Sequence, residues 1–181
     1  MLRIAVAQFN ATVGDLTGNV ERIIACAAEA KARGAQVLLT PELALCGYPP
    51  EDLLLRPDFY RACSRALDDL AGRVEGIASG LAIVVGHPEE HAGRRYNAAT
   101  VIENGHKKAV YRKIRLPNYE VFDEMRYFDA GSEACVVTLG GVRCGINICA
   151  DIWEAGAAEL AHGAGAELLL VLNASPCHLE K

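Results

Sequence analysis

Apolar residues occur along this chain in two patterns. Short, nearly unbroken apolar runs are typical of buried strands, whereas longer segments with apolar residues three or four positions apart are typical of helices. We expect strands over residues 2–9, 37–39, 82–86, 98–103, 107–112, 135–139, 142–148 and 167–172. We expect helices over residues 19–33, 58–74 and 155–162. Because strands both alternate with helices and follow one another directly, the pattern predicts one α/β domain of the α+β kind, with mixed sheets, over residues 1–181.

Turn-forming residues separate several of these segments. Asn19 is suited to cap the first helix and Gly34 to end it. The pairs Asn104-Gly105 and Gly140-Gly141 each lie between two expected strands and predict two tight hairpins.

The composition narrows the class of protein. The 181 residues are 51% apolar and 23% charged, which is typical of a globular domain with its own core. The net charge of −5 argues against a nucleic-acid partner, because phosphate binding requires a basic face. No apolar segment reads as a signal peptide or membrane span, so we expect a cytoplasmic protein that does not bind membranes. The seven cysteines form no C-x-x-C pair and are odd in number, which favours free thiols and no metal site.

The chain stops shortly after the last expected strand, residues 167–172, which is apolar on both faces. Such a strand needs cover on both sides, and two or three helices are few for this much sheet. We therefore expect either a second subunit, in a homo-oligomer, or a longer polypeptide to complete the layer.

Cys149 lies where the expected strand 142–148 meets a segment that is expected to open a helix. A nucleophile at such a turn is held rigidly, and nearby backbone N–H groups can stabilise an oxyanion. The N-terminus of a helix also lowers the pKa of a thiol, which favours the reactive thiolate. The alternative is a buried structural cysteine, the commoner role of this residue.

Glu42 and Lys113 also stand at strand ends, after residues 37–39 and 107–112. Strand ends on one rim can converge, so a carboxylate, an ammonium and a thiol can meet there. Taken singly, Glu42 could be a solvated carboxylate at the sheet edge, and Lys113 could be a lysine that discourages edge pairing. The histidines are expected at the surface or in loops, although His178 could approach a site.

Three motifs, in this order, resemble the nitrilase superfamily of carbon–nitrogen hydrolases, whose members use a Glu–Lys–Cys triad. They are Thr-Pro-Glu-Leu at residues 40–43, Tyr-Arg-Lys-Ile at 111–114 and Gly-Ile-Asn-Ile-Cys at 145–149. A closer resemblance is to the glutaminase domains of glutamine-dependent NAD synthetases. It is carried by residues 41–53, 116–128, 148–153 and 172–176, and it extends over the chain from Leu2 onward.

The resemblance implies a nitrilase-like four-layer α-β-β-α sandwich that is incomplete at its C-terminus. It also implies glutamine hydrolysis through a thioester, with Glu42 as general base, Cys149 as nucleophile and Lys113 stabilising the oxyanion. Glu124 resembles a second carboxylate that positions Lys113 or the substrate in related amidases. The substrate-binding residues suggested in this way are Tyr48, Tyr119, Phe122, Glu124 and Ser175.

The resemblance further implies a synthetase domain, downstream or as a partner, that uses ATP, Mg and the released ammonia to amidate deamido-NAD. No cofactor is implied on this chain itself. Two alternatives stay open. The chain could be another nitrilase-type amidase that acts on a different small amide or nitrile, or a non-catalytic fragment that needs a larger assembly.

Overall fold

The structure, a computed structural model, describes residues 1–119 and 122–175. His178 and parts of the 116–128 and 172–176 motifs lie outside the described residues. The strands are β1 (Ile4–Val6), β2 (Val37–Leu39), β3 (Ala82–His91), β4 (Arg94–Glu103), β5 (His106–Arg112), β6 (Cys135–Leu139), β7 (Val142–Ile148) and β8 (Leu168–Leu172). The α-helices are α1 (Leu16–Ala32), α2 (Pro57–Ala78) and α3 (Ala157–Gly163). Short 3₁₀ helices are η1 (Glu51–Leu55), η2 (Glu124–Arg126) and η3 (Cys149–Ile152).

The strands form two mixed sheets, as the sequence pattern predicted. The first has the order β1-β2-β3-β4-β5, with parallel pairing up to β3 and antiparallel pairing beyond it. The second has the order β6-β7-β8, in which β7 is antiparallel to β6 and parallel to β8. Both expected hairpins form, and all four of their turn residues, Asn104, Gly105, Gly140 and Gly141, have positive φ. That backbone geometry suits two-residue hairpin turns.

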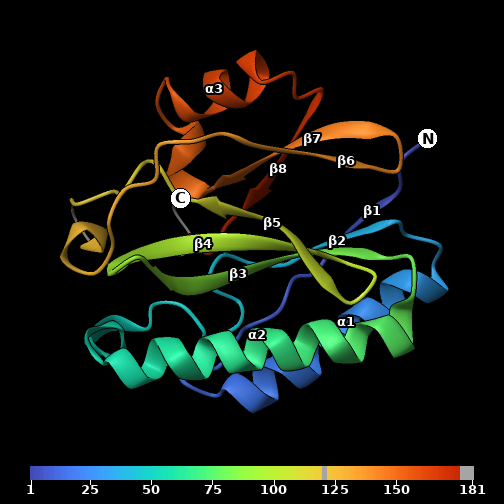
Figure 1. The fold of residues 1–181 in the computed structure, drawn as a ribbon, viewed down its shortest axis with the longest axis horizontal. Coiled ribbons are helices and arrows are strands. Elements are labelled where there is room, and N and C mark those ends of the chain that lie inside the picture. Colours follow the sequence, from blue (N-terminus) through green and yellow to red (C-terminus); the bar gives the residue numbers. More distant parts are fainter. Residues whose placement is uncertain (120–121, 176–181) are drawn as a thin grey trace, which may run out of the picture.

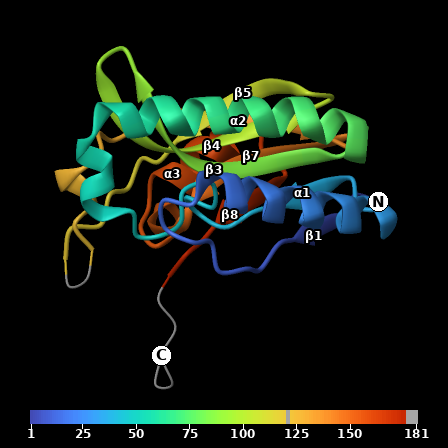
Figure 2. The same cartoon turned by 90° about the horizontal axis from the view of Figure 1, so that it is seen from below.

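The elements are stacked in layers. The helices α1 and α2 lie side by side against one face of the first sheet (Figure 2). The second sheet lies on the opposite side of the first sheet, and α3 lies beyond the second sheet, packed against β7 (Figure 1).

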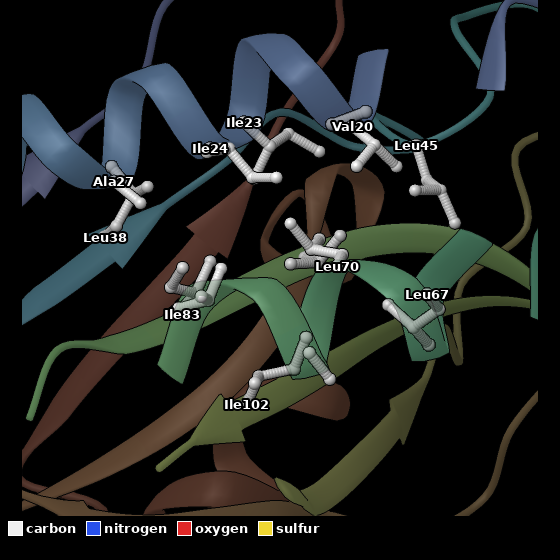
Figure 3. Close-up of a cluster of buried hydrophobic side chains, with 14 of the residues drawn as sticks. Val20, Ile23, Ile24, Ala27, Leu38, Leu45, Leu67, Leu70, Ile83 and Ile102 are labelled. Atoms are coloured by element: carbon white, nitrogen blue, oxygen red, sulfur yellow. The ribbon is translucent and has the colours of Figure 1, made fainter. Parts of the chain in front are cut away.

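Two cores follow from the alternation of side chains along the strands. Ile83 and Val85 of β3 belong to the core beneath the helices, whereas Ala82 and Val84 belong to the core between the sheets. A strand covered on both faces needs apolar residues at every position, which explains the unbroken apolar runs. Figure 3 shows the helix-side core, where Leu70 of α2 packs among side chains from α1 and the strands.

The N-terminus of α1 differs from the expectation. Asp15 caps the helix, because its Oδ1 accepts a hydrogen bond from the Gly18 N–H at 2.9 Å. Asn19 lies inside the helix and is fully buried, so its side chain cannot serve as the cap. Its Nδ2 donates to the carbonyl oxygens of Thr12 and Leu45, at 2.8 and 3.2 Å. The buried amide thus ties two loop segments to α1 through their carbonyl oxygens.

His87 was expected at the surface or in a loop, and this was wrong. The β3–β4 hairpin extends further than its apolar residues do, so His87 is a buried residue of β3. Its Nε2 lies 2.6 Å from Thr100 Oγ1, and its Nδ1 lies 3.1 Å from the Pro88 carbonyl oxygen. Burial lowers the pKa of His87, so the ring is neutral at pH 7.

Candidate active site

Three chemically active side chains follow three different strand ends. Glu42 comes shortly after β2, Lys113 directly after β5, and Cys149 directly after β7. The chain reverses direction twice between β3 and β5, so β5 points the same way as β2 and both end at the same rim. Lys113 Nζ consequently donates a hydrogen bond to Glu42 Oε1 at 2.7 Å, although 71 residues separate them in the sequence.

Lys113 is the centre of a buried charge cluster. Its side chain is 0% exposed, and its Nζ also donates to Glu124 Oε1 at 2.6 Å. Asn97 Nδ2 donates to Glu42 Oε1 at 2.8 Å and so helps to fix that carboxylate. Burial by itself lowers the pKa of Lys113, but the charges of Glu42 and Glu124 outweigh it and raise the pKa above its ordinary value. The ammonium therefore stays protonated although its side chain is fully buried.

Glu124 shares the lysine with Glu42. Burial, opposed by the charge of Lys113 and assisted by that of Glu42, raises the pKa of Glu124 to about 7. This carboxyl group can therefore take up or release a proton near neutral pH, a property that acid–base chemistry uses. Its contact with Lys113 agrees with one of the two roles that the sequence suggested for it.

A tight backbone turn holds Glu42. The backbone N–H of Glu42 donates to the carbonyl oxygen of Asn173 at 3.3 Å, and Leu43 has a positive φ of 51°. A Cβ added at Gly86 would lie 2.6 Å from the Leu43 nitrogen and 2.6 Å from the Pro41 carbonyl oxygen. Only glycine leaves room for this turn to lie against β3.

Cys149 stands on a strained turn between β7 and η3. Its φ is +44°, a region that side chains with a Cβ seldom adopt, and the residue is 2% exposed. Its Sγ lies 3.5 Å from Ser175 Oγ. Burial, together with the charge of Glu42, raises the pKa of Cys149 to about 11. The expectation of a lowered thiol pKa was wrong, because burial and the carboxylates outweigh the hydrogen bond of Ser175 and the charge of Lys113, so the resting thiol is protonated.

A cavity of about 470 Å³ opens beside Glu42. Tyr48 and Ser175 line it, and Ser175 links it to the Cys149 sulfur. Burial and the charges of Glu42, Glu124 and Cys149 raise the pKa of Tyr48. Polar side chains and apolar ones both line the cavity, the polar ones including Gln8, Asn10, Thr40 and Asn173.

The aromatic residues suggested by the resemblance lie elsewhere. Tyr119 is 52% exposed and lines a separate cavity of about 410 Å³ together with Trp153. Phe122 stacks edge-on between Tyr119 and Trp153, at centroid distances of 6.0 and 5.8 Å. It also lines a cavity of about 250 Å³ with Tyr48 and Glu124. These two residues border the site without lining the 470 Å³ cavity.

Two buried polar residues near the site were missed from the sequence. Asn97 lies in β4 directly before the apolar run at which that strand was expected to start. Asp151 lies in η3, two positions after Cys149, and is completely buried. For Asp151 the available signal was a charged residue among mainly apolar ones, because such residues are buried only with partners, whereas Asn97 follows Arg94-Arg95-Tyr96 and resembles the polar end of a strand.

Two further features of the described residues bear on the class of protein. Within residues 1–119 and 122–175, no three His, Cys, Asp or Glu side chains are grouped so that they could hold a metal ion. No helix in this part of the chain combines the length and the hydropathy needed to cross a membrane.

Residues 3–181 match the carbon-nitrogen hydrolase family. The chain is 50% identical over 178 residues to a glutamine-dependent NAD(+) synthetase of Xanthomonas campestris, covering 97% of this chain and 32% of that protein. It is 43% identical over 182 residues to the corresponding synthetase of Thermotoga maritima, covering 99% and 31%. The chain therefore spans about a third of the length of these curated relatives.

Solved structures with the same fold include two kinds of enzyme. The glutamine-dependent NAD+ synthetase of Acinetobacter baumannii matches with a TM-score of 0.89 and 34% identity, over 98% of this chain and 33% of that one. The NitN amidase of Nesterenkonia sp. AN1 matches with a TM-score of 0.82 and 30% identity, over 96% of this chain and 67% of that one.

Proposed function

Because the chain belongs to the carbon–nitrogen hydrolase family, we propose that it hydrolyses the side-chain amide of glutamine with Cys149 as nucleophile. One observation carries this proposal. A fully buried lysine that follows β5 is held by two carboxylates, Glu42 after β2 and Glu124 in η2, and the charges of these groups act on the thiol that follows β7. Stability alone does not explain such a cluster, because a buried ion pair seldom stabilises a fold more than apolar residues of the same volume would.

Each member has a role that fits its environment. The Cys149 thiol is protonated at rest, so a general base has to remove its proton when the substrate binds. Glu42 supplies this base, and the thiolate then attacks the amide carbonyl carbon. The oxyanion that forms is stabilised by the Lys113 ammonium and by backbone N–H groups beside Cys149. The charge of the ammonium acts strongly because the lysine side chain is fully buried.

The later steps reuse the same groups. Glu42 returns the proton to the leaving nitrogen, so that ammonia departs and a thioester to Cys149 remains. Glu42 then activates a water molecule that cleaves the thioester, which releases glutamate and restores the thiol. Glu124 keeps Lys113 in place throughout, through the 2.6 Å contact between Oε1 and Nζ.

The size and polarity of the 470 Å³ cavity support a small polar amide as substrate. Tyr48 and Ser175 line this cavity, and Ser175 Oγ lies 3.5 Å from the Cys149 sulfur. We propose that both residues contact the substrate. Tyr119 and Phe122 would act from the rim of the site.

We propose that the layers of Figure 1 are those of the nitrilase-like four-layer α-β-β-α sandwich. The likeness to NAD synthetases supports a further proposal, namely that the ammonia serves a synthetase domain that amidates deamido-NAD with ATP and Mg. That domain would be joined to this chain or associate with it, and the assembly would be a homo-oligomer.

The test measures ammonia and glutamate release from glutamine by the purified protein. We expect Cys149→Ala to abolish both while the circular dichroism spectrum stays unchanged, because within residues 1–119 and 122–175 the thiol makes no polar contact besides that with Ser175. The matched control is Cys144→Ala, a buried cysteine of β7 whose Sγ has the Val142 carbonyl oxygen as its polar contact among the described residues. Ammonia release that persists in Cys149→Ala would refute the mechanism.

A second candidate, a general small-amide hydrolase, is favoured by the likeness to the Nesterenkonia amidase. The active-site cysteine of that enzyme was modified by acrylamide and by fluoroacetamide. Comparing kcat/KM for glutamine, asparagine, propionamide and simple nitriles separates the two. Faster turnover of propionamide than of glutamine would favour the second candidate, and the Cys149 mechanism would then still stand.

A further inference from the structure

Asp151 is a completely buried carboxylate that makes no hydrogen bond to the proposed reacting side chains. Its oxygens accept hydrogen bonds from residues that lie next to Lys113 and Cys149 in the chain. Its Oδ1 accepts the backbone N–H groups of Ile114 and Arg115, at 3.1 and 2.8 Å. Its Oδ2 accepts the backbone N–H of Ile148 at 2.9 Å and the hydroxyl of Tyr111 at 2.8 Å. Four donors on two oxygens leave this carboxylate satisfied without a cation.

These donors come from two different sheets. Tyr111 lies in β5 of the first sheet, and Ile114 and Arg115 directly follow Lys113. Ile148 is the last residue of β7 in the second sheet and directly precedes Cys149. One carboxylate therefore spans the junction between the two sheets at the rim where the lysine and the cysteine emerge.

We propose that Asp151 is a positioning residue that locks the backbone carrying Lys113 against the turn carrying Cys149. This inference rests on the proposed function. Packing between two sheets is set by apolar side chains that have no direction, so it does not by itself fix two strand ends to a fraction of an ångström. Charged hydrogen bonds are directional and short, and they supply that precision.

The lock also accounts for the strained turn at Cys149. The positive φ of this residue is unfavourable and has to be held by surrounding contacts. The hydrogen bond from the Ile148 N–H to Asp151 Oδ2 closes the turn on both sides of Cys149. Tyr111 adds a side-chain link, and its hydroxyl is itself held by Asn147 Nδ2 at 3.3 Å.

Asp151→Asn tests the lock with almost no change in volume. An amide has one acceptor oxygen, so its NH₂ group must face donors that the carboxylate accepted, and at least one backbone N–H loses its partner. We expect kcat for glutamine to fall by about 100-fold with KM within about twofold, because displacement of reacting groups by about 1 Å has effects of this size. The control is Asp129→Asn, whose carboxylate accepts the Arg95 N–H at 3.0 Å and pairs with Arg94 at 3.3 Å, and so bonds to neither the Lys113 backbone nor the Cys149 turn.

A second readout separates positioning from mere stability. The Lys113 charge lowers the pKa of Cys149, so a lysine that moves away lets this pKa rise. The rate of Cys149 alkylation by iodoacetamide, followed by peptide mass spectrometry between pH 7 and 10, should therefore fall at each pH in Asp151→Asn. It should stay at the wild-type value in Asp129→Asn. A purely structural role would lower the melting temperature and leave the alkylation profile of the folded protein unchanged.

Tyr111→Phe keeps the test decisive if Asp151→Asn does not fold, since it removes one of the four donors and retains the ring. We expect kcat to fall by about tenfold, the effect of one hydrogen bond to a charged group, with slower alkylation. Folded variants with unchanged kcat and unchanged alkylation would overturn the lock while the proposed function stands. If instead the wild-type chain does not hydrolyse glutamine but Asp151→Asn still slows alkylation, the proposed function fails and the lock stands.

Discussion

The burial of Glu124, which shares Lys113 with Glu42, predicts how the stability of the fold depends on pH. Glu124 is buried, and its pKa is raised from 4.5 to about 7, whereas in the unfolded chain it titrates near its ordinary value. Between these two values the folded protein holds a proton that the unfolded chain releases. The contribution of Glu124 to the free energy of unfolding is therefore highest below pH 4.5. It falls as the pH rises toward 7 and stays level above that pH.

The magnitude follows from the same two values. A pKa difference between 4.5 and about 7 corresponds to about 3 kcal/mol of unfolding free energy over the whole window. Glu124→Gln removes the titrating group while its amide oxygen can still accept the hydrogen bond from Lys113. Between pH 5 and 8 we expect the wild type to lose about 2–3 kcal/mol of stability that the variant does not lose.

Urea unfolding, followed by circular dichroism at pH 5, 6, 7 and 8, measures this difference. The control is Glu75→Gln, which removes an exposed carboxylate on α2, far from the charge cluster. The m-values should agree among the three proteins, because the same surface is exposed on unfolding. If the stability of wild type and Glu124→Gln changes in parallel over this range, the raised pKa and the shared-lysine argument are refuted.

Three further substitutions test the elements that support the site. Gly86→Ala brings a Cβ within 2.6 Å of the Leu43 nitrogen, so the turn that carries Glu42 has to shift. The melting temperature and the rate of ammonia release should both fall, and an unchanged rate would contradict this reasoning. Leu70→Ala empties a fully buried position beneath the helices and should cost about 2–5 kcal/mol in urea unfolding, with kcat retained below the melting temperature. Asp15→Ala removes the α1 cap and should cost about 1 kcal/mol, so a stability equal to wild type would argue against this capping assignment.

The local patterns of the sequence predicted much of the fold. Apolar runs located strands such as β2 and β3, because a strand buried on both faces leaves no room for polar residues, whereas the largely polar β5 was located by the Asn104-Gly105 turn. The pattern was weakest at the ends of elements, where burial no longer decides the residue type. Polar residues extend β3 to His91 because the hairpin with β4 continues, and Asn19 is buried because a neighbouring loop needs its amide.

The candidate chemistry was predicted as residue types at strand ends, and their mutual arrangement was not. The sequence indicated Glu42, Lys113 and Cys149 by their positions after expected strands and, taken together, by the resemblance of their motifs to the nitrilase superfamily. Glu42 and Lys113 touch because β2 and β5 run in the same direction and end at the same rim, which only the tertiary structure decides. The protonated state of the thiol also depended on the tertiary structure, because desolvation and a neighbouring carboxylate act through space.

What the sequence by itself determined is therefore local: the periodicity of each segment, the turns that join them, and the motifs that indicate a carbon–nitrogen hydrolase. What only the tertiary structure decided is which distant residues share a buried volume. Asn97 and Asp151 show the difference, since each holds groups from other segments by hydrogen bonds that no spacing along the chain could reveal. Hydrogen bonds and charges depend on distances of a few ångströms in space, and those distances are set when the two sheets pack.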